Sequence, residues 1–126
     1  MVVRIDAIVL FVKNIDHLKA FYVDLLGLEI LEETNSKWVL LNAGNCNIGL
    51  HKIGDAFLDN DQEASTFDTN TKIIFEIQGD IYLFRETLVS KNIKLKEVMT
   101  WDNYPYLVCD GEDPEGNVFQ LQAKKN

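Results

Sequence analysis

The sequence has two histidines and two cysteines, the side chains best suited to proton transfer near neutral pH and to transition-metal binding. His17 falls early in a predicted first helix, away from its apolar stripe, so we expect it to be solvated. His51 lies two residues after Gly49 in a predicted strand, so the two should share one face. There His51 could act as a base or hydrogen-bond donor in a cavity, or it could be a rim histidine satisfied by a neighbour. Cys46 and Cys109 lack Cys-x-x-Cys spacing, and we expect free thiols with a packing role.

Two charged residues, Lys72 and Glu76, interrupt an apolar run in the second half of the chain. Burying either charge is costly unless it is paired, so a functional role is one interpretation. In the other interpretation, their charged groups lie in solvent at the open mouth of a cavity. Along an extended strand they lie about 13 Å apart, so we do not expect them to pair with each other.

Large aromatic side chains form another group of candidates: Trp38 lies in a first-half strand, and Trp101, Tyr104 and Tyr106 lie before or in a second-half strand. Such rings offer flat surfaces with one polar group, which suits the stacking of a planar or cationic ligand. They could equally fill the core or a dimer interface.

The elements that position these residues follow the same order in both halves of the chain. In the first half we predict strands at 7–12, 28–32, 37–42 and 47–52, with a helix between Asn14 as N-cap and Gly27 as the left-handed terminating residue. The strand at 7–12 is almost wholly apolar, which predicts burial on both faces. In the second half we predict strands at 72–77, 94–99, 106–109 and 118–123, with a helix from Gly79-Asp80 to Asn92. The pattern of strand, helix and three strands, repeated after about 65 residues, indicates a pair of related modules.

Length and charge limit the classes of function. With 126 residues we predict one domain, composed of module one at about 1–53, a linker at 54–70 and module two at about 71–126. The acidic segment 54–70 is a lid only if it closes over a ligand. The net charge of −8 makes nucleic acid a poor partner and would favour a cation, although solubility alone could explain it. Without a signal peptide or an apolar run of about 18 residues, we expect a cytoplasmic protein that does not enter membranes.

Two motifs support a family resemblance. Phe21-Tyr22-Val23-Asp24-Leu25-Leu26-Gly27-Leu28 has the form FYxxxLGL, and Asp113-Pro114-Glu115-Gly116-Asn117 predicts a tight turn into the last strand. In this order the chain resembles the vicinal-oxygen-chelate superfamily of glyoxalases, bleomycin resistance proteins and dioxygenases. The resemblance implies an α+β fold in which two βαβββ modules form a cup-like, barrel-like mixed sheet.

The resemblance also gives four positions at which metal-using members hold a divalent ion. In this sequence they are occupied by Ala7, Gly49, Lys72 and Gln120. Alanine and glycine offer no ligand, lysine brings a positive charge, and only the glutamine oxygen could coordinate weakly. We therefore expect no metal site and no cofactor.

The function implied by these observations is metal-independent binding of a small molecule, such as an aromatic or cationic antibiotic, by a cytoplasmic homodimer. Bleomycin resistance proteins, which the chain resembles here, sequester drug in an acidic, aromatic-lined cleft. We expect no catalytic residue and a ligand-binding set made of Phe11, Trp38, His51, Lys72, Glu76, Trp101, Tyr104, Tyr106 and Gln120. The alternatives are an enzyme, either a glyoxalase-like lyase or isomerase or a ring-cleaving dioxygenase, and a regulatory module that binds a partner.

Overall fold

The computed structural model describes residues 2, 5–54 and 71–126. The chain divides into two compact units, Met1–Gln62 and Glu63–Asn126, and each is described by itself. The predicted linker, apart from Gly54, lies outside the described residues.

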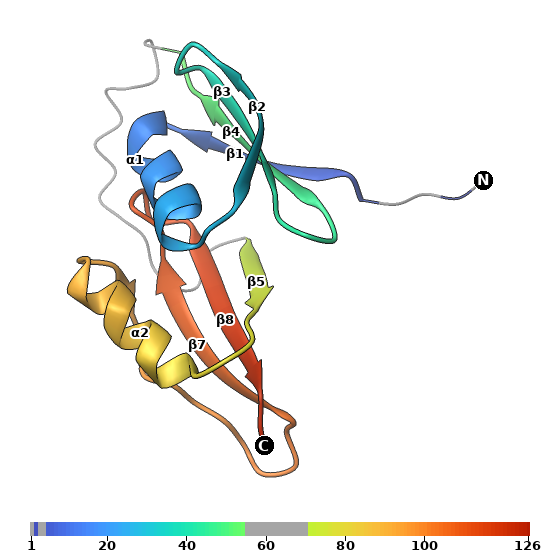
Figure 1. Ribbon diagram of the computed structural model, residues 1–126, viewed down its shortest axis with the longest axis vertical. Coiled ribbons are helices and arrows are strands. Elements are labelled where there is room, and N and C mark those ends of the chain that lie inside the picture. The colour runs from blue at the N-terminus through green and yellow to red at the C-terminus, as the bar shows by residue number, and fades with distance from the viewer. Residues whose placement is uncertain (1, 3–4, 55–70) are drawn as a thin grey trace. The chain divides into compact units, whose positions relative to one another are not determined.

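Unit one follows the predicted order of elements (Figure 1). Its strands are β1 (Ala7–Val12), β2 (Glu29–Thr34), β3 (Trp38–Asn42) and β4 (Asn47–Lys52), in the sheet order β1-β4-β3-β2. β1 runs parallel to β4, and the other neighbours are antiparallel. Between β1 and β2 come helix α1 (Ile15–Lys19) and the π-helical segment η1 (Ala20–Leu25).

Short-range signals account for both ends of this helical segment. The Asn14 side chain accepts a hydrogen bond from the backbone N–H of His17, as an N-cap does. Gly27, at a φ of 79°, ends the segment, and the N–H of Leu28 returns to the carbonyl of Tyr22. The prediction of one continuous α-helix was wrong, because Leu26 N–H bonds the carbonyl of Phe21, five residues back, and this widens the last turns.

Sheet A, formed by β1–β4, has one face covered by the helical segment and one open face. The covered face carries apolar side chains that are almost fully buried with those of α1 and η1: Leu10, Val12, Val39, Leu41, Ile48 and Leu50. The open face carries Val9 and Phe11, which are 41% and 69% exposed. The prediction that β1 is buried on both faces was therefore wrong, because an apolar run does not reveal whether a second layer covers it.

Unit two repeats the plan with β5 (Lys72–Glu76), α2 (Ile81–Ser90), β6 (Lys94–Leu95), β7 (Tyr106–Glu112) and β8 (Val118–Lys124). Its sheet B has the order β5-β8-β7-β6, and β5 is parallel to β8. The Asp80 side chain caps α2 by accepting from two backbone N–H groups, and Asn92 follows the helix at a φ of 67°. Helix α2 packs along β7 and β8 (Figure 1).

All four strands of sheet B differ in length from the prediction, β5 and β8 by a single residue and β6 and β7 by more. β6 has two residues instead of six, and Met99 adds only an isolated bridge to Val108. The Arg85 guanidinium donates to the carbonyls of Leu95 and Lys96 where the strand stops. β7 is longer than predicted and runs on through Glu112.

The predicted turn before β8 is present. The buried carboxylate of Asp113 accepts from the backbone N–H groups of Glu115 and Asn117, both at 2.9 Å, and Gly116 has a φ of 84°. The turn thus satisfies a buried charge and directs the chain back into the sheet.

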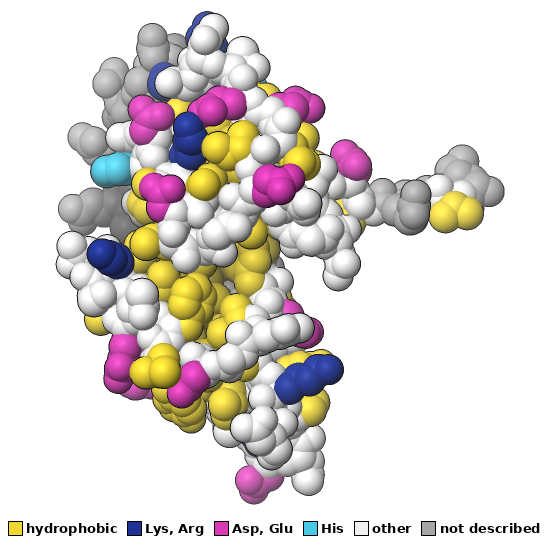
Figure 2. All heavy atoms as spheres, in the orientation of Figure 1, with side chains coloured by type: hydrophobic (Ala, Val, Ile, Leu, Met, Phe, Trp, Pro, Cys, Tyr) yellow, Lys and Arg dark blue, Asp and Glu magenta, His cyan; other side chains and the backbone are white. Residues whose placement is uncertain are grey.

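Two βαβββ units with mixed sheets confirm the predicted α+β fold class. Among the described residues, no helix is both long and apolar enough to span a membrane. Asp and Glu side chains are spread over the visible face of both units (Figure 2), consistent with the net charge of −8.

Candidate functional site

The open face of sheet A brings three of the predicted site residues together. His51 is the register partner of Phe11 on one side and of Trp38 on the other. Its ring centroid lies 5.4 Å from that of Phe11 and 6.2 Å from that of Trp38. The Nδ1 atom of His51 lies 3.0 Å from the carbonyl oxygen of Lys52. The three rings form one cluster, which we call the sheet A aromatic cluster.

Gly49 provides the space in which the Trp38 ring lies. A Cβ atom at position 49 would be 2.4 Å from Cη2 of Trp38, 2.8 Å from Cζ3 and 3.3 Å from Cζ2. Any larger residue would therefore displace the indole. Its Nε1–H donates to Oε1 of Glu32 at 3.2 Å, which fixes the other end of the ring system.

On the open face of sheet B, Lys72 and Gln120 are joined through a residue that the sequence analysis missed. The Asp110 carboxylate accepts from Lys72 Nζ at 3.0 Å and from Gln120 Nε2 at 2.9 Å, using one oxygen for each. Asp110 escaped attention because the predicted strand ended at Cys109. Strand alternation would have identified it, since Val108 and Asp110 share the open face once β7 continues.

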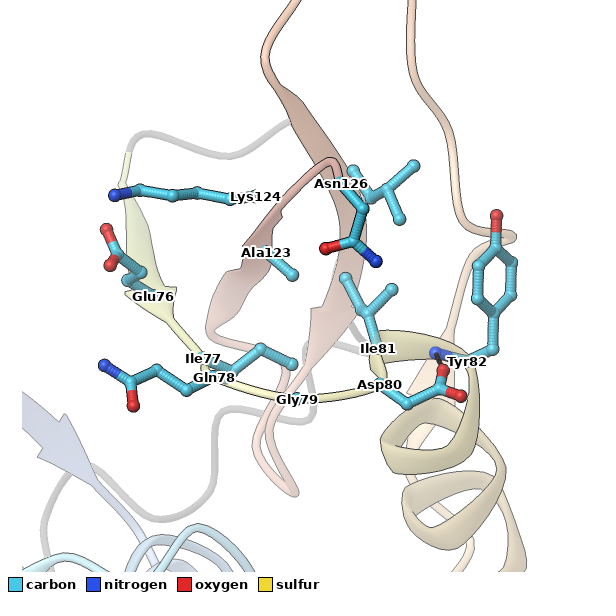
Figure 3. Close-up of a pocket in the computed structure, with 11 residues that line it drawn as sticks. Glu76, Ile77, Gln78, Gly79, Asp80, Ile81, Tyr82, Ala123, Lys124 and Asn126 are labelled. Atoms are coloured by element: carbon cyan, nitrogen blue, oxygen red, sulfur yellow. Dashed lines mark hydrogen bonds between the residues drawn. The ribbon is translucent and has the colours of Figure 1, made fainter.

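Glu76 lies apart from this pair, beside a cleft of about 560 Å³ in unit two. The residues that line the cleft include the apolar Ile77, Ile81 and Ala123, and Figure 3 shows Glu76 and Lys124 on one side of it and Ile81 and Asn126 on the other. The sequence analysis gave no sign of this cleft, which arises where β5 leaves the sheet and turns into α2.

The remaining aromatic candidates form a second cluster before and at the start of β7. Ring centroids are 5.3 Å apart for Trp101 and Tyr104, and 5.8 Å apart for Tyr104 and Tyr106. Trp101 is 52% exposed, and Lys125 Nζ donates to its backbone carbonyl. The predicted set of site residues thus divides into separate local groups, of which the one at Trp101 and Tyr104 lies in the loop before β7.

The residues at the four positions where the resemblance implies metal ligands do not fit a divalent ion. Ala7 and Gly49 have no donor atom, and Lys72 and Gln120 both direct N–H groups toward Asp110. Within residues 5–54 and 71–126, no group of three or more His, Cys, Asp or Glu side chains could hold a metal.

Neither cysteine that the structure describes is in a disulfide. Cys109 is buried, and its thiol donates to the carbonyl of Lys96 at 3.2 Å. Burial raises the pKa of the Cys109 thiol because the thiolate loses hydration, although the nearby Arg85 opposes this effect. Cys109 therefore has the character of a packing residue rather than a nucleophile.

Comparison with known proteins gives the same fold. The model of the Glyoxalase/Bleomycin resistance protein/Dioxygenase superfamily matches residues 4–121. Among curated proteins, none matches the chain.

Several solved structures match almost the whole chain. A variant of the fosfomycin resistance protein FosX from Listeria monocytogenes, in complex with Mn(II) and a dihydroxypropylphosphonic acid, has a TM-score of 0.78 and 20% identity over 99% of this chain and 93% of that one. TnmS3, an antibiotic binding protein from Streptomyces sp. CB03234, has a TM-score of 0.71 and 13% identity over 98% of each chain. Lactoylglutathione lyase from Agrobacterium tumefaciens has a TM-score of 0.70 and 19% identity over 95% of this chain and 92% of that one. At these identities the likeness shows the fold alone.

Proposed function

Because the chain belongs to the Glyoxalase/Bleomycin resistance protein/Dioxygenase superfamily, we propose that it binds a small molecule without a metal ion. The fold hosts both metal enzymes and binding proteins, so the choice between them depends on the residues at the site.

The observation that carries this proposal is the chemistry at the former metal positions. Trp38 fills the space beside Gly49, which is one of the positions at which the family resemblance implies a metal ligand. Asp110 binds the polar groups of both Lys72 and Gln120. An ion beside Lys72 and Gln120 would be repelled by the Lys72 ammonium group and would compete with both side chains for the Asp110 carboxylate.

The ligand that we propose is an aromatic or cationic compound, and an antibiotic is one example. The sheet A aromatic cluster and the cluster at Trp101, Tyr104 and Tyr106 supply ring surfaces suited to stacking. The net charge of −8 favours a positively charged partner. A binding role also agrees with the described function of TnmS3, which has the same fold.

The proposal is tested by a thermal-shift screen of aromatic amines, glycopeptides and thiols. Each compound is measured in parallel with a chelator and with added Mn(II), Ni(II) or Zn(II). We expect at least one compound to raise the melting temperature equally in every condition. Stabilisation that requires an added metal, or turnover of hemithioacetals or catechols with one, would contradict the proposal.

A further inference from the structure

We propose that the open face of sheet A binds an organic cation, such as a quaternary or protonated amine with apolar substituents, against the Trp38 ring and the adjacent Glu32 carboxylate. This inference rests on the proposed function, and it specifies both the chemical class of the ligand and the part of the fold that recognises it.

The first step is the exposure of apolar surface on this face. Phe11 is 69% exposed and Val9 is 41% exposed, and both project from β1 on the side opposite the helical segment. Large apolar side chains exposed together commonly mark a binding surface. Trp38 is held beside them by the space at Gly49 and by its hydrogen bond to Glu32. The ring is therefore positioned before any ligand arrives.

The second step is the charge on the same face. Strand register places Glu29 opposite Asn42 and Glu32 opposite Leu40. Because Asn42 and Leu40 alternate with the buried Val39 and Leu41 along β3, both glutamates lie on the open face. Within the strands β1–β4, no Lys or Arg lies on this face by register. Sheet B differs, since its open face carries Lys72.

The covered face of the same sheet provides a contrast. Glu33, next to Glu32 in β2, pairs with Val39 on the covered side, and its carboxylate accepts from Lys19 of α1. The acid on the covered side thus has a cation from the chain itself. On the open face, aromatic rings lie beside carboxylates, and the strands carry no fixed positive charge. Such a face attracts an organic cation in two ways, through the ring face and through the carboxylate.

The experiment compares choline with its uncharged isostere 3,3-dimethylbutan-1-ol by NMR titration of the full chain. The two probes have similar shape and differ in charge, so they separate cation recognition from apolar contact. We expect saturable shifts of the Trp38 indole N–H with choline, at an affinity about tenfold higher than that of the alcohol.

Matched variants locate the site. Trp38→Leu should weaken choline binding by about tenfold, and Trp38→Phe, which keeps a smaller ring, should weaken it less. Glu32→Gln should weaken binding a few-fold, by removing one carboxylate. The control is Glu33→Gln, which alters the neighbouring carboxylate on the covered face. This variant should bind choline as the unaltered chain does.

Equal binding of choline and the alcohol, no saturable binding of choline, or equal effects of Glu32→Gln and Glu33→Gln would each overturn this inference. Those outcomes leave the proposed function standing if another compound stabilises the protein without metal in the screen. A requirement for metal in that screen would contradict the proposed function, whatever choline does.

Discussion

Replacing Gly49 with alanine is the most direct test of how the sheet A aromatic cluster is built. The new methyl group would lie 2.4 Å from Cη2 of Trp38, well inside van der Waals contact. Gly49 is not among the glycines with positive φ, so the backbone accepts alanine and the effect comes from this contact alone. Trp38 must turn outward, and its hydrogen bond to Glu32 breaks.

The magnitude follows from these two losses. Overpacking typically costs about 1–3 kcal/mol, and a ring that is only half-buried can relieve part of this by turning toward solvent. Loss of the exposed hydrogen bond adds about 0.5–1 kcal/mol at most. We therefore expect Gly49→Ala to lower the free energy of unfolding by about 1–2 kcal/mol and the melting temperature by roughly 3–8 °C.

The assay is urea unfolding followed by circular dichroism, together with tryptophan emission in the folded state. Trp38 and Trp101 are the two tryptophans, so the measurement is made in a Trp101→Phe background, where emission reports Trp38 alone. The emission of Gly49→Ala should shift to longer wavelength as the indole enters water. In a Trp38→Leu background the cost of Gly49→Ala should largely disappear. An unchanged emission maximum would refute the described packing. So would a loss of unfolding free energy on Gly49→Ala that is as large in the Trp38→Leu background as in the unaltered chain.

Other predictions concern unit two. Asp80→Ala removes the N-cap of α2 and should lower the free energy of unfolding by about 1 kcal/mol in urea titrations. Asp80→Asn should keep most of the stability of the unaltered chain, because asparagine also caps helices well. Cys109 should react with iodoacetamide more slowly than Cys46, and its labelling should require a higher pH, because burial raises the pKa of its thiol; mass spectrometry of labelled peptides measures both rates. The raised pKa means that the stabilising contribution of Cys109 is complete below the ordinary thiol pKa of about 8.5 and is lost as the pH rises beyond it. Asp110→Asn removes the charge facing Lys72, and since both side chains are partly exposed, urea titration should show a loss of at most about 1 kcal/mol.

The order and ends of most elements could be predicted because they depend on short-range signals. Asn14, Gly27, Asp80 and Asn92 each mark a helix end through a local hydrogen bond or a left-handed backbone, which needs no knowledge of the tertiary fold. Strand alternation placed His51 on the same face as Gly49, and the sheet register agrees.

The misses arose where tertiary partners decide the outcome. The helix before Gly27 widens because the N–H of Leu26 bonds the carbonyl of Phe21, five residues back, instead of the carbonyl four residues back. The spacing of apolar residues does not show which of these two carbonyls accepts the bond. The end of β7 was placed too early because Asp110 and Gly111 have low strand propensity, yet pairing with β8 holds them in the sheet. That error concealed Asp110, the residue that binds Lys72 and Gln120.

Residue types at the predicted site could be read from the sequence, but their grouping could not. Trp38 meets Phe11 and His51 through the register of β1, β3 and β4, whereas Trp101 meets Tyr104 within a loop. Glu76 adjoins a cleft at the point where the chain passes from the end of β5 into α2, and strand alternation does not predict this cleft.

The most direct test of metal-independent binding is a ligand titration in which the metal content of the same sample is measured. A compound that stabilises the protein is titrated by calorimetry into chelator-treated protein and into protein dialysed against Mn(II), and both samples are then assayed by elemental analysis. We predict superimposable binding curves and metal far below stoichiometric amounts in both. Binding that appears only in the Mn(II) sample, with stoichiometric metal retained, would contradict the account.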